Sequence, residues 1–298
     1  MPTPNFFVIG AARSGTTSLY HYLKQHPQIY MSSVKEPRFF AFKGVADHLD
    51  SYYEPSGSDI VKESITSFEA YCALFQGVSC EKAIGEASPL YLWSSKACEN
   101  IHQTIPDAKL IAILRDPVER AFSHFLLNKE SNCFAQAVQD ELSHVRDGWF
   151  SGWRHIARGF YHIQLKRYFD LFDREQIKIY LYEDFCNKPA SVLRDLFQFL
   201  DVDDDFLPDM SKRYSQSQAV RSKALNSILT TNNQLKNLSK PFIPSVLKEK
   251  IFRMVKHLNT HKPKLARKIR RDLIEIYRED ILGLQELIHR DLSKWLVA

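Results

Sequence analysis

The chain has 298 residues, of which 44% are hydrophobic, 12% aromatic and 25% charged. These values are typical of a globular domain and exclude a disordered chain, a collagen and a coiled coil. No run approaches the roughly 20 apolar residues of a membrane helix, and the N-terminus lacks the pattern of a signal peptide. Five scattered cysteines without a CxxC motif favour reduced thiols. We therefore expect a cytoplasmic protein without a transmembrane segment.

Positive charge is concentrated in one stretch near the C-terminus, although the net charge of the chain is only +5. The stretch from Lys236 to Arg271 contains twelve Lys or Arg residues and one acid, Glu249. Such a stretch could bind nucleic acid, an anionic membrane or a polyanionic substrate. Its apolar residues recur at helical spacing, so amphipathic helices with solvated basic faces are the simpler interpretation. We expect no nucleic acid partner.

Short apolar runs of strand length alternate with segments of helical periodicity along the first two thirds of the chain. The expected strands are Phe6–Ile9, Ile29–Met31, a strand ending at Ala83–Gly85, Lys109–Leu114 and Ile177–Tyr182. The expected helices are Ser18–Gln25, Phe68–Phe75, a helix from Pro117 capped by Asp116 and Glu119, Phe134–Arg146, Tyr161–Phe172 and Pro189–Leu200. Residues 41–65 are interpreted as an excursion from this pattern.

This alternation predicts an α/β fold with a central parallel sheet covered by helices on both faces. We expect a single domain over residues 1–298, with a helical C-terminal portion at about 205–298. Ligands in such folds bind beyond the carboxyl ends of the strands. Three segments of interest begin there, namely Gly10–Ser18, Glu86–Tyr91 and Arg115–Ser123.

The loop after the first strand has the spacing of a phosphate-binding loop. Gly10-Ala-Ala-Arg-Ser-Gly-Thr-Thr17 joins a strand to a helix, so its backbone N–H groups and the helix N-terminus form an anion cradle. Thr16 replaces the lysine of the P-loop pattern, which argues against metal-assisted γ-phosphoryl transfer. A tight strand-to-helix turn without a ligand is the alternative. The binding residues predicted here are Arg13, Ser14, Gly15, Thr16, Thr17 and Ser18.

A second phosphate cradle is predicted after the strand at 109–114. Arg115 lies at the strand end and Ser123 lies two turns into the following helix. Hydrogen bonds to charged groups contribute about 1.5–3 kcal/mol each, so this pair could hold one more phosphate. Alone, the pair would be explained by a helix-capping salt bridge. Together with the first loop, it predicts a ligand with two separated phosphate groups.

At these residues the chain resembles sulfotransferases that use 3′-phosphoadenosine-5′-phosphosulfate (PAPS). Residues 7–18 are similar to their 5′-phosphosulfate loop, and residues 114–124 are similar to their 3′-phosphate motif. Lys35-Glu-Pro-Arg-Phe-Phe40 resembles the K-E-x-x-F-F element, and Gly85-Glu-Ala-Ser-Pro-Leu-Tyr-Leu92 resembles the G-E-x-[ST]-P-x-Y element. The resemblance spans nearly the whole chain and is greatest to the bacterial and heparan-sulfate-type branch. It departs at Arg13 and Ala87, where many members carry lysine.

The resemblance implies a P-loop-like three-layer fold and a metal-independent transfer of the sulfuryl group of PAPS to a hydroxyl, or an amine, by in-line displacement. Arg13 and Lys35 would stabilise charge on the leaving phosphate, and Arg115 and Ser123 would bind the 3′-phosphate. We predict Glu86 as the general base, because the resemblance places the acceptor-side glutamate there and a carboxylate can accept a hydroxyl proton. The alternatives are a structural Glu86 carboxylate that caps a turn and an exposed Lys35 without a role.

Two further residues complete the predicted nucleotide site. The segment Arg158-Gly-Phe-Tyr161 resembles a family segment near the nucleotide, where Tyr161 could pack on adenine or in the core. Arg221 falls where the family closes a loop over the 3′-phosphate. No HExxH motif or Cys/His cluster is present in the sequence, so we predict no metal.

Two other functions stay open from the sequence alone. A P-loop small-molecule kinase would require magnesium-dependent ATP turnover, against which Thr16 argues. A non-enzymatic nucleotide- or polyanion-binding module would use the basic stretch and leave Glu86 and Lys35 idle. Aromatic residues in segments 41–81 and 134–158 suit a small-molecule or lipid-like acceptor, whereas the basic stretch suits an acidic glycan or a carrier-protein-bound acceptor. We expect a bacterial enzyme.

Overall fold

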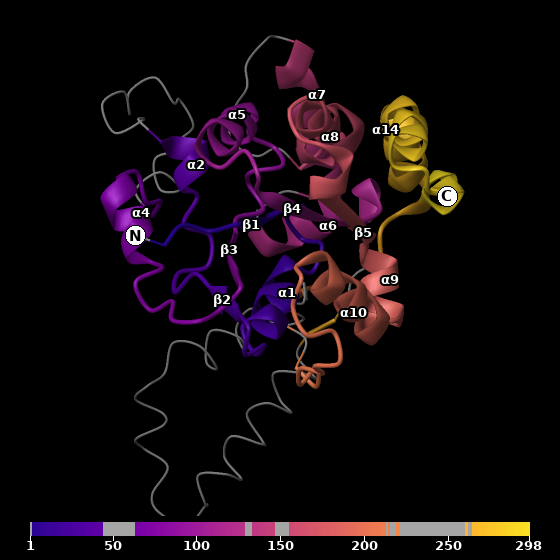
Figure 1. Cartoon of the computed structure of the whole chain (residues 1–298). Coiled ribbons are helices and arrows are strands. Elements are labelled where there is room, and N and C mark those ends of the chain that lie inside the picture. Colours follow the sequence, from indigo (N-terminus) through magenta and orange to yellow (C-terminus); the bar gives the residue numbers. More distant parts are fainter. Residues whose placement is uncertain are drawn as a thin grey trace, which may run out of the picture.

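A five-stranded parallel sheet forms the centre of the protein (Figure 1). The computed structural model describes residues 2–43, 63–128, 133–146, 155–212, 214, 219–220, 260–261 and 264–298. The strands are β1 (Phe6–Gly10), β2 (Ile29–Met31), β3 (Ala83–Ala87), β4 (Lys109–Leu114) and β5 (Ile177–Leu181). Their order is β2-β3-β1-β4-β5, and every neighbouring pair is parallel. A short antiparallel pair, β6 (Ala219–Val220) with β7 (Thr260–His261), lies outside this sheet.

Both faces of the sheet are buried, which explains why its strands are continuous apolar runs in the sequence. All residues of β1 are buried, and in β4 only Lys109 is partly exposed. Successive side chains of a strand point to opposite faces. Phe7 and Ile9 therefore pack in one hydrophobic cluster, while Phe6 and Val8 pack in the other. The predicted three-layer α/β fold is confirmed.

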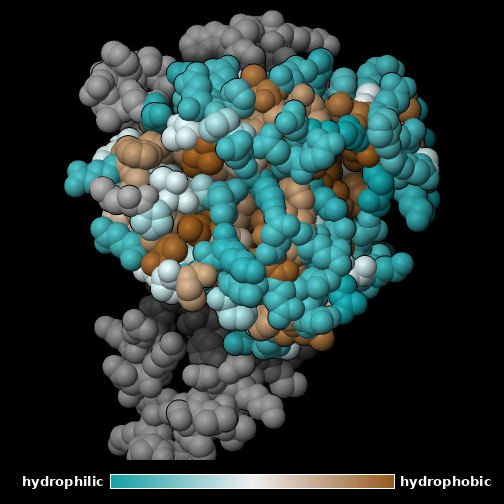
Figure 2. Space-filling model, in the orientation of Figure 1, coloured by the Kyte–Doolittle hydropathy of each residue, from teal (hydrophilic) through white to brown (hydrophobic). Residues whose placement is uncertain are grey.

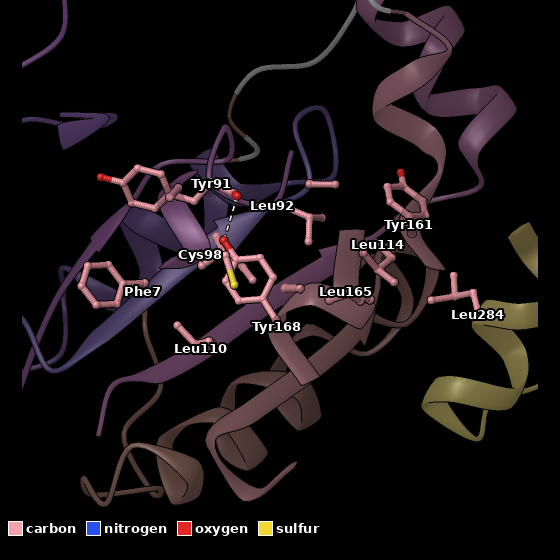
Figure 3. Packing of buried hydrophobic residues seen from close by; sticks show 14 of the residues in the cluster. Phe7, Tyr91, Leu92, Cys98, Leu110, Leu114, Tyr161, Leu165, Tyr168 and Leu284 are labelled. Atoms are coloured by element: carbon pink, nitrogen blue, oxygen red, sulfur yellow. Dashed lines mark hydrogen bonds between the residues drawn. The ribbon is translucent and has the colours of Figure 1, made fainter. Parts of the chain in front are cut away.

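Helices α1 (Thr16–Leu23), α9 (Tyr182–Asn187) and α10 (Pro189–Phe199) cover the face toward which Phe6 and Val8 point. The other face is covered by α2 (Phe39–Phe42), α4 (Phe68–Ala73), α5 (Ser95–Thr104), α6 (Pro117–Asn128), α7 (Phe134–Arg146), α8 (Tyr161–Phe169) and α14 (Arg267–Ile288). Figure 3 shows part of this second layer, where Tyr168 of α8 lies over the sheet and its hydroxyl donates to the Tyr91 carbonyl at 2.7 Å.

The C-terminal helix α14 packs against α8 and α6 at the side of the molecule (Figure 1). Its Asp280 carboxylate accepts hydrogen bonds from the backbone N–H groups of His162 at 3.1 Å and Ile163 at 3.4 Å. Asp280 thus caps the first turn of α8, whose own N-cap residue makes no side-chain hydrogen bond. The Tyr277 hydroxyl also donates to the Ile156 carbonyl at 2.8 Å. Helix α14 therefore belongs to the layer of helices that covers this face of the sheet.

The observed elements match the expected ones apart from shifted ends, additional helices and the β6–β7 strand pair, which lies in the portion expected to be helical. The Asp116 carboxylate caps α6 as predicted, because it accepts from the N–H groups of Val118 and Glu119 at 2.9 and 3.2 Å. The sequence did not predict helix α5, because few of its side chains are buried and its remaining face is polar. Tyr182 was expected to end a strand, but it begins α9 directly after β5.

Hydrophilic residues cover most of the described part of the face shown in Figure 2. Of the helices that can be described, none is both long enough and apolar enough to cross a membrane.

Candidate active site

The predicted site segments converge at the carboxyl edge of the sheet. Strand β1 pairs with β3 on one side and with β4 on the other, and all three run in the same direction. The chain leaves β1 toward α1 on one face of the sheet and leaves β4 toward α6 on the other face. In open α/β sheets, strands whose connections diverge in this way border the ligand-binding crevice. The loops at 11–15 and 115–116 border this crevice.

The first loop keeps hydrogen-bond donors available for an anion. Gly15 precedes α1 with a φ of 87°, and a side chain there would meet the Tyr182 ring at 3.2 Å and the Phe185 ring at 3.3 Å. Gly15, the N-cap residue of α1, has no side chain that could cap the helix, so it leaves the first N–H groups of α1 to a ligand. The Ser14 hydroxyl is buried and finds no hydrogen-bond partner in the described part of the chain. These features fit the predicted phosphate cradle.

Arg13 and Arg115 join the two predicted cradles. Arg13 donates from Nε to the Ser123 hydroxyl at 3.3 Å, and Arg115 donates from Nη1 to the Arg13 carbonyl at 3.2 Å. The Arg115 guanidinium also lies 4.9 Å from the centre of the Tyr182 ring and 3.5 Å from the Glu119 carboxylate. Burial and the Arg115 charge lower the pKa of Arg13. Like charges held this close favour the binding of an anion between them.

The segment from Lys35 to Phe40 lies beside the end of β3. The Glu36 N–H donates to the Ala87 carbonyl at 3.1 Å. This hydrogen bond holds the segment against the end of β3. Glu36 and Arg38 both have a left-handed backbone, with φ values of 62° and 58°. The Glu36 carboxylate pairs with the Lys35 ammonium, and it accepts from Arg38 Nη2 at 3.1 Å. The segment thus presents one carboxylate between two cations.

Glu36 is more accessible than Glu86, the other carboxylate at this edge, because 31% of the Glu36 side chain is exposed. Burial raises the pKa of Glu36, but the charges and hydrogen bonds of Lys35 and Arg38 outweigh this effect and lower it. The carboxylate is therefore ionised at neutral pH. The sequence did not predict a role for Glu36, although this residue stands next to Lys35 in the K-E-x-x-F-F element. The left-handed backbone that exposes Glu36 has no signal in the sequence.

Glu86, the predicted base, is completely buried. One of its oxygens accepts from the Tyr71 hydroxyl at 2.7 Å and the Tyr91 hydroxyl at 2.8 Å, and the other accepts from the Ser88 hydroxyl at 2.7 Å. Burial raises its pKa to about 7, against the lowering effect of these hydrogen bonds. This arrangement favours the structural alternative stated above, in which the carboxylate orders the turn at Ser88.

The remaining predicted residues lie in different surroundings. Thr16, Thr17 and Ser18 form the first turn of α1, and the Ser18 hydroxyl accepts from the Tyr214 N–H at 3.1 Å. Tyr161 is 1% exposed, and its ring centre lies 6.3 Å from that of Trp295, so it packs in the core. Figure 3 shows Tyr161 on the side of the cluster that faces α14. Arg221 lies outside the described residues, as does most of the basic stretch 236–271.

A pair of histidines lies next to Ser123 but has no metal-site geometry. His124 Nδ1 and His155 Nδ1 are 3.2 Å apart, and burial together with the nearby arginines Arg158 and Arg120 lowers the pKa of His124 well below its usual value. Buried imidazoles that contact each other are typical of packing. Over the residues that can be described, no group of three His, Cys, Asp or Glu side chains could hold a metal ion.

Comparisons with known proteins identify the family of the chain. A model of the sulfotransferase family matches residues 4–206. The crystal structure of a sulfotransferase from Alicyclobacillus acidocaldarius is 32% identical, covers 99% of both chains and superposes with a TM-score of 0.75. The membrane-associated sulfotransferase kil1 of Dictyostelium discoideum is 27% identical over 79% of this chain and 65% of its own length. Human carbohydrate sulfotransferase 15 is 27% identical over 67% of this chain and 44% of its own length.

The fold and the converging loops define an α/β protein with a P-loop-like site. The chain belongs to the sulfotransferase family. It spans between 44% and 65% of the length of the two curated relatives described above.

Proposed function

We propose that this sulfotransferase takes the sulfuryl group from PAPS and transfers it to a hydroxyl group. The observation that carries the proposal is the direct contact between the two cationic cradles, in which Arg13 bonds to Ser123 and Arg115 bonds to the Arg13 carbonyl. A nucleotide with a 3′-phosphate and a 5′-phosphosulfate has anionic groups at both ends of its ribose, as two joined cradles require. The Ser14 hydroxyl, which finds no partner among the described residues, and the N-terminus of α1, whose N-cap residue Gly15 has no side chain, also fit this donor.

Each cation has a defined part in the proposed displacement. The acceptor oxygen forms a bond to sulfur, the bond between sulfur and the phosphate oxygen breaks, and 3′-phosphoadenosine-5′-phosphate (PAP) leaves. Arg13 and Lys35 stabilise the negative charge that develops on the departing phosphate. Arg115 and Ser123 hold the 3′-phosphate, while Gly15 to Ser18 hold the 5′ end through backbone N–H and hydroxyl groups. In this proposal, the positive charges of the side chains stabilise the negative charge of the phosphate groups, which a metal ion does in P-loop kinases.

The acceptor hydroxyl must lose its proton as it attacks, and two carboxylates lie near enough to the sheet edge to take it. We assign this role to Glu36, because its carboxylate is ionised and partly exposed beside Lys35. Glu86, which the sequence favoured, is buried and has hydrogen bonds to both oxygens. Proton transfer to Glu86 would therefore require these hydroxyl groups to move aside.

The proposed acceptor is a hydroxyl of a glycan. Support comes from relatives whose names specify carbohydrate and heparan sulfate as substrates, among them carbohydrate sulfotransferase 15 and a mouse heparan sulfate N-deacetylase/N-sulfotransferase that is 26% identical over 67% of this chain. The apolar alternative rests on aromatic residues of which most, including Tyr52, Tyr53, Trp149, Phe150 and Trp153, lie outside the described residues.

Calorimetry with PAP, PAPS and ATP tests the donor. We expect PAP and PAPS to bind at least tenfold more tightly than ATP, because only they place a phosphate at the 3′ position. ATP binding as tight as that of PAP would overturn the proposal and favour the kinase. Incubation with radiolabelled PAPS and a panel of glycans and alkyl alcohols then tests the acceptor, and label on the alcohols alone would overturn the glycan assignment.

A further inference from the structure

Two hydroxyl bridges connect the buried carboxylate of Glu86 to the backbone of the segment that carries Glu36. The Ser88 hydroxyl donates to Glu86 Oε2 at 2.7 Å and accepts from the Arg38 N–H at 3.1 Å. The Tyr91 hydroxyl donates to Glu86 Oε1 at 2.8 Å and accepts from the Phe40 N–H at 3.3 Å. Each bridge therefore runs from a backbone N–H of the segment, through a hydroxyl, to the same carboxylate.

The direction of these hydrogen bonds depends on the carboxylate. A hydroxyl group has one proton to donate and lone pairs with which to accept. An ionised carboxylate only accepts, so it draws the protons of Ser88 and Tyr91 toward itself and leaves their lone pairs for the two N–H groups. An amide at this position would direct one of its protons at a hydroxyl, and that hydroxyl would have to turn its own proton elsewhere. Networks of this kind are strong only while every member is satisfied.

The bridged segment has a backbone that needs such support. Glu36 and Arg38 have φ values of 62° and 58°, a conformation that costs a non-glycine residue free energy and persists when its surroundings hold it. Arg38, one of these two residues, supplies its N–H to the Ser88 bridge. Lys35 and Glu36 lie three and two residues before Arg38, the first bridged residue. The positions of Lys35 and Glu36, the two side chains proposed to act at the reacting atoms, thus depend on contacts that end at Glu86.

We propose that Glu86 is a positioning residue, which acts through Ser88 and Tyr91 to hold the segment from Lys35 to Phe40 beside the end of β3, with Glu36 and Arg38 in their left-handed conformation. This inference rests on the proposed function for its catalytic consequence, because it assigns the contact with the reacting atoms to Lys35 and Glu36. The structural part of the inference concerns the unliganded protein and can be tested without donor or acceptor.

The Tyr71 hydroxyl provides a matched control. It donates to the same Glu86 Oε1 at 2.7 Å, as close as the Tyr91 hydroxyl, but it is not bonded to a backbone N–H of the segment. The Tyr71 ring stacks on Phe39 with ring centres 4.6 Å apart, and this contact is kept in Tyr71→Phe. Tyr71→Phe therefore removes one hydrogen bond from Glu86 and leaves both bridges in place.

The experiment measures hydrogen exchange of peptides spanning residues 36–41 in the free protein, for Ser88→Ala, Tyr91→Phe, Glu86→Gln and Tyr71→Phe. Loss of a bridge should raise exchange in these peptides about 3- to 10-fold in the first two variants, and at least as much in Glu86→Gln. Tyr71→Phe should change it less than twofold. An equal increase in Tyr71→Phe, or no increase in Ser88→Ala and Tyr91→Phe, would overturn the inference.

Transfer from radiolabelled PAPS to a heparan-type polysaccharide gives the second measurement. The bridge variants should lower kcat about 3- to 10-fold while the Kd for PAP, measured by calorimetry, stays within twofold. If kcat falls more than 100-fold in Glu86→Gln and exchange in residues 36–41 is unchanged, Glu86 is the base and the positioning role is overturned. If the wild type neither binds PAP nor transfers sulfate, the proposed function fails, while the exchange data still decide the structural part.

Discussion

The donor side and the acceptor side of the site are built on opposite principles. Around the loop after β1, donors are left open, since the Ser14 hydroxyl finds no described partner and Gly15, the N-cap residue of α1, has no capping side chain. Around the end of β3, the Glu86 carboxylate has hydrogen bonds to both oxygens, and two of its partners, Ser88 and Tyr91, also accept from backbone N–H groups of the segment at 35–40. A surface that binds a polyanion needs unsatisfied donors, whereas a segment that orients reactive groups needs a rigid, satisfied support.

The largest expected effect tests which carboxylate on the acceptor side takes the proton. Glu36→Gln keeps the shape of the side chain but cannot accept a proton, so turnover should fall by about 10²–10⁴. PAP affinity should not weaken, because the substitution removes a negative charge beside Lys35 and Arg38. Turnover over a pH series with an alcohol acceptor, together with PAP calorimetry, provides the measurement. Full activity in Glu36→Gln would return the role to Glu86.

A substitution on the donor side should lower the affinity for the nucleotide and not turnover. Arg115→Ala should weaken PAP binding by about 10- to 100-fold, since hydrogen bonds to charged groups contribute about 1.5–3 kcal/mol. Adenosine 5′-phosphosulfate, which lacks the 3′-phosphate, should lose much less affinity. Calorimetry with both nucleotides measures the difference. Equal losses would mean that Arg115 only organises the loop through its bond to the Arg13 carbonyl.

The same contrast explains what could be predicted from the sequence. The donor loop is recognisable because its function depends on local spacing, with Gly15 at a left-handed position directly before a helix. The acceptor side depends on contacts between distant residues, such as Tyr71 on α4 and Glu86 on β3, which no local pattern encodes. The sequence therefore predicts Glu86 as the general base, although its carboxylate is buried, and it does not single out Glu36, whose exposure depends on backbone conformation. Likewise, nothing in the spacing of Tyr161 distinguishes core packing from adenine binding.

The burial of Glu86 predicts a pH dependence of stability. Its pKa of about 7 lies above the value for an unfolded glutamate, so the folded state binds the proton more tightly. The stability from this group is complete below the unfolded pKa and is lost as the pH rises through about 7. The groups that face Glu86 are Tyr71, Ser88 and Tyr91, and the nearby charge of Glu36 adds to the upward shift.

Thermal unfolding of the wild type and Glu86→Gln between pH 5 and pH 8 measures this dependence. The Tm advantage of the wild type should shrink as the pH rises, by a few degrees over the series. Glu36 has a lowered pKa and contributes with the opposite sign, but it is present in both proteins and cancels in the difference. A Tm difference that is constant with pH would show that Glu86 stays ionised throughout.

The smallest expected effect concerns the support of the donor side by the C-terminal helix. Arg270 of α14 donates to Asp116 Oδ2 at 2.7 Å and lies 3.7 Å from Glu119, the acid that also contacts Arg115. Without Arg270, Glu119 would attract Arg115 more strongly and compete with the 3′-phosphate for it. Arg270→Ala should therefore weaken PAP binding about two- to fivefold, consistent with a partly exposed ion pair.

A substitution elsewhere on α14 separates this effect from a general loss of positive charge. Arg278 pairs with Glu275 on the same helix, and both side chains are exposed. Arg278→Ala removes the same charge from α14 without touching Asp116 or Glu119, so PAP affinity should stay within measurement error. The loss in Arg270→Ala should also be smaller for adenosine 5′-phosphosulfate than for PAP, because Glu119 acts on the 3′-phosphate through Arg115. Equal losses in both arginine variants would mean that α14 contributes only a diffuse field, and that the donor side is organised by its own two loops.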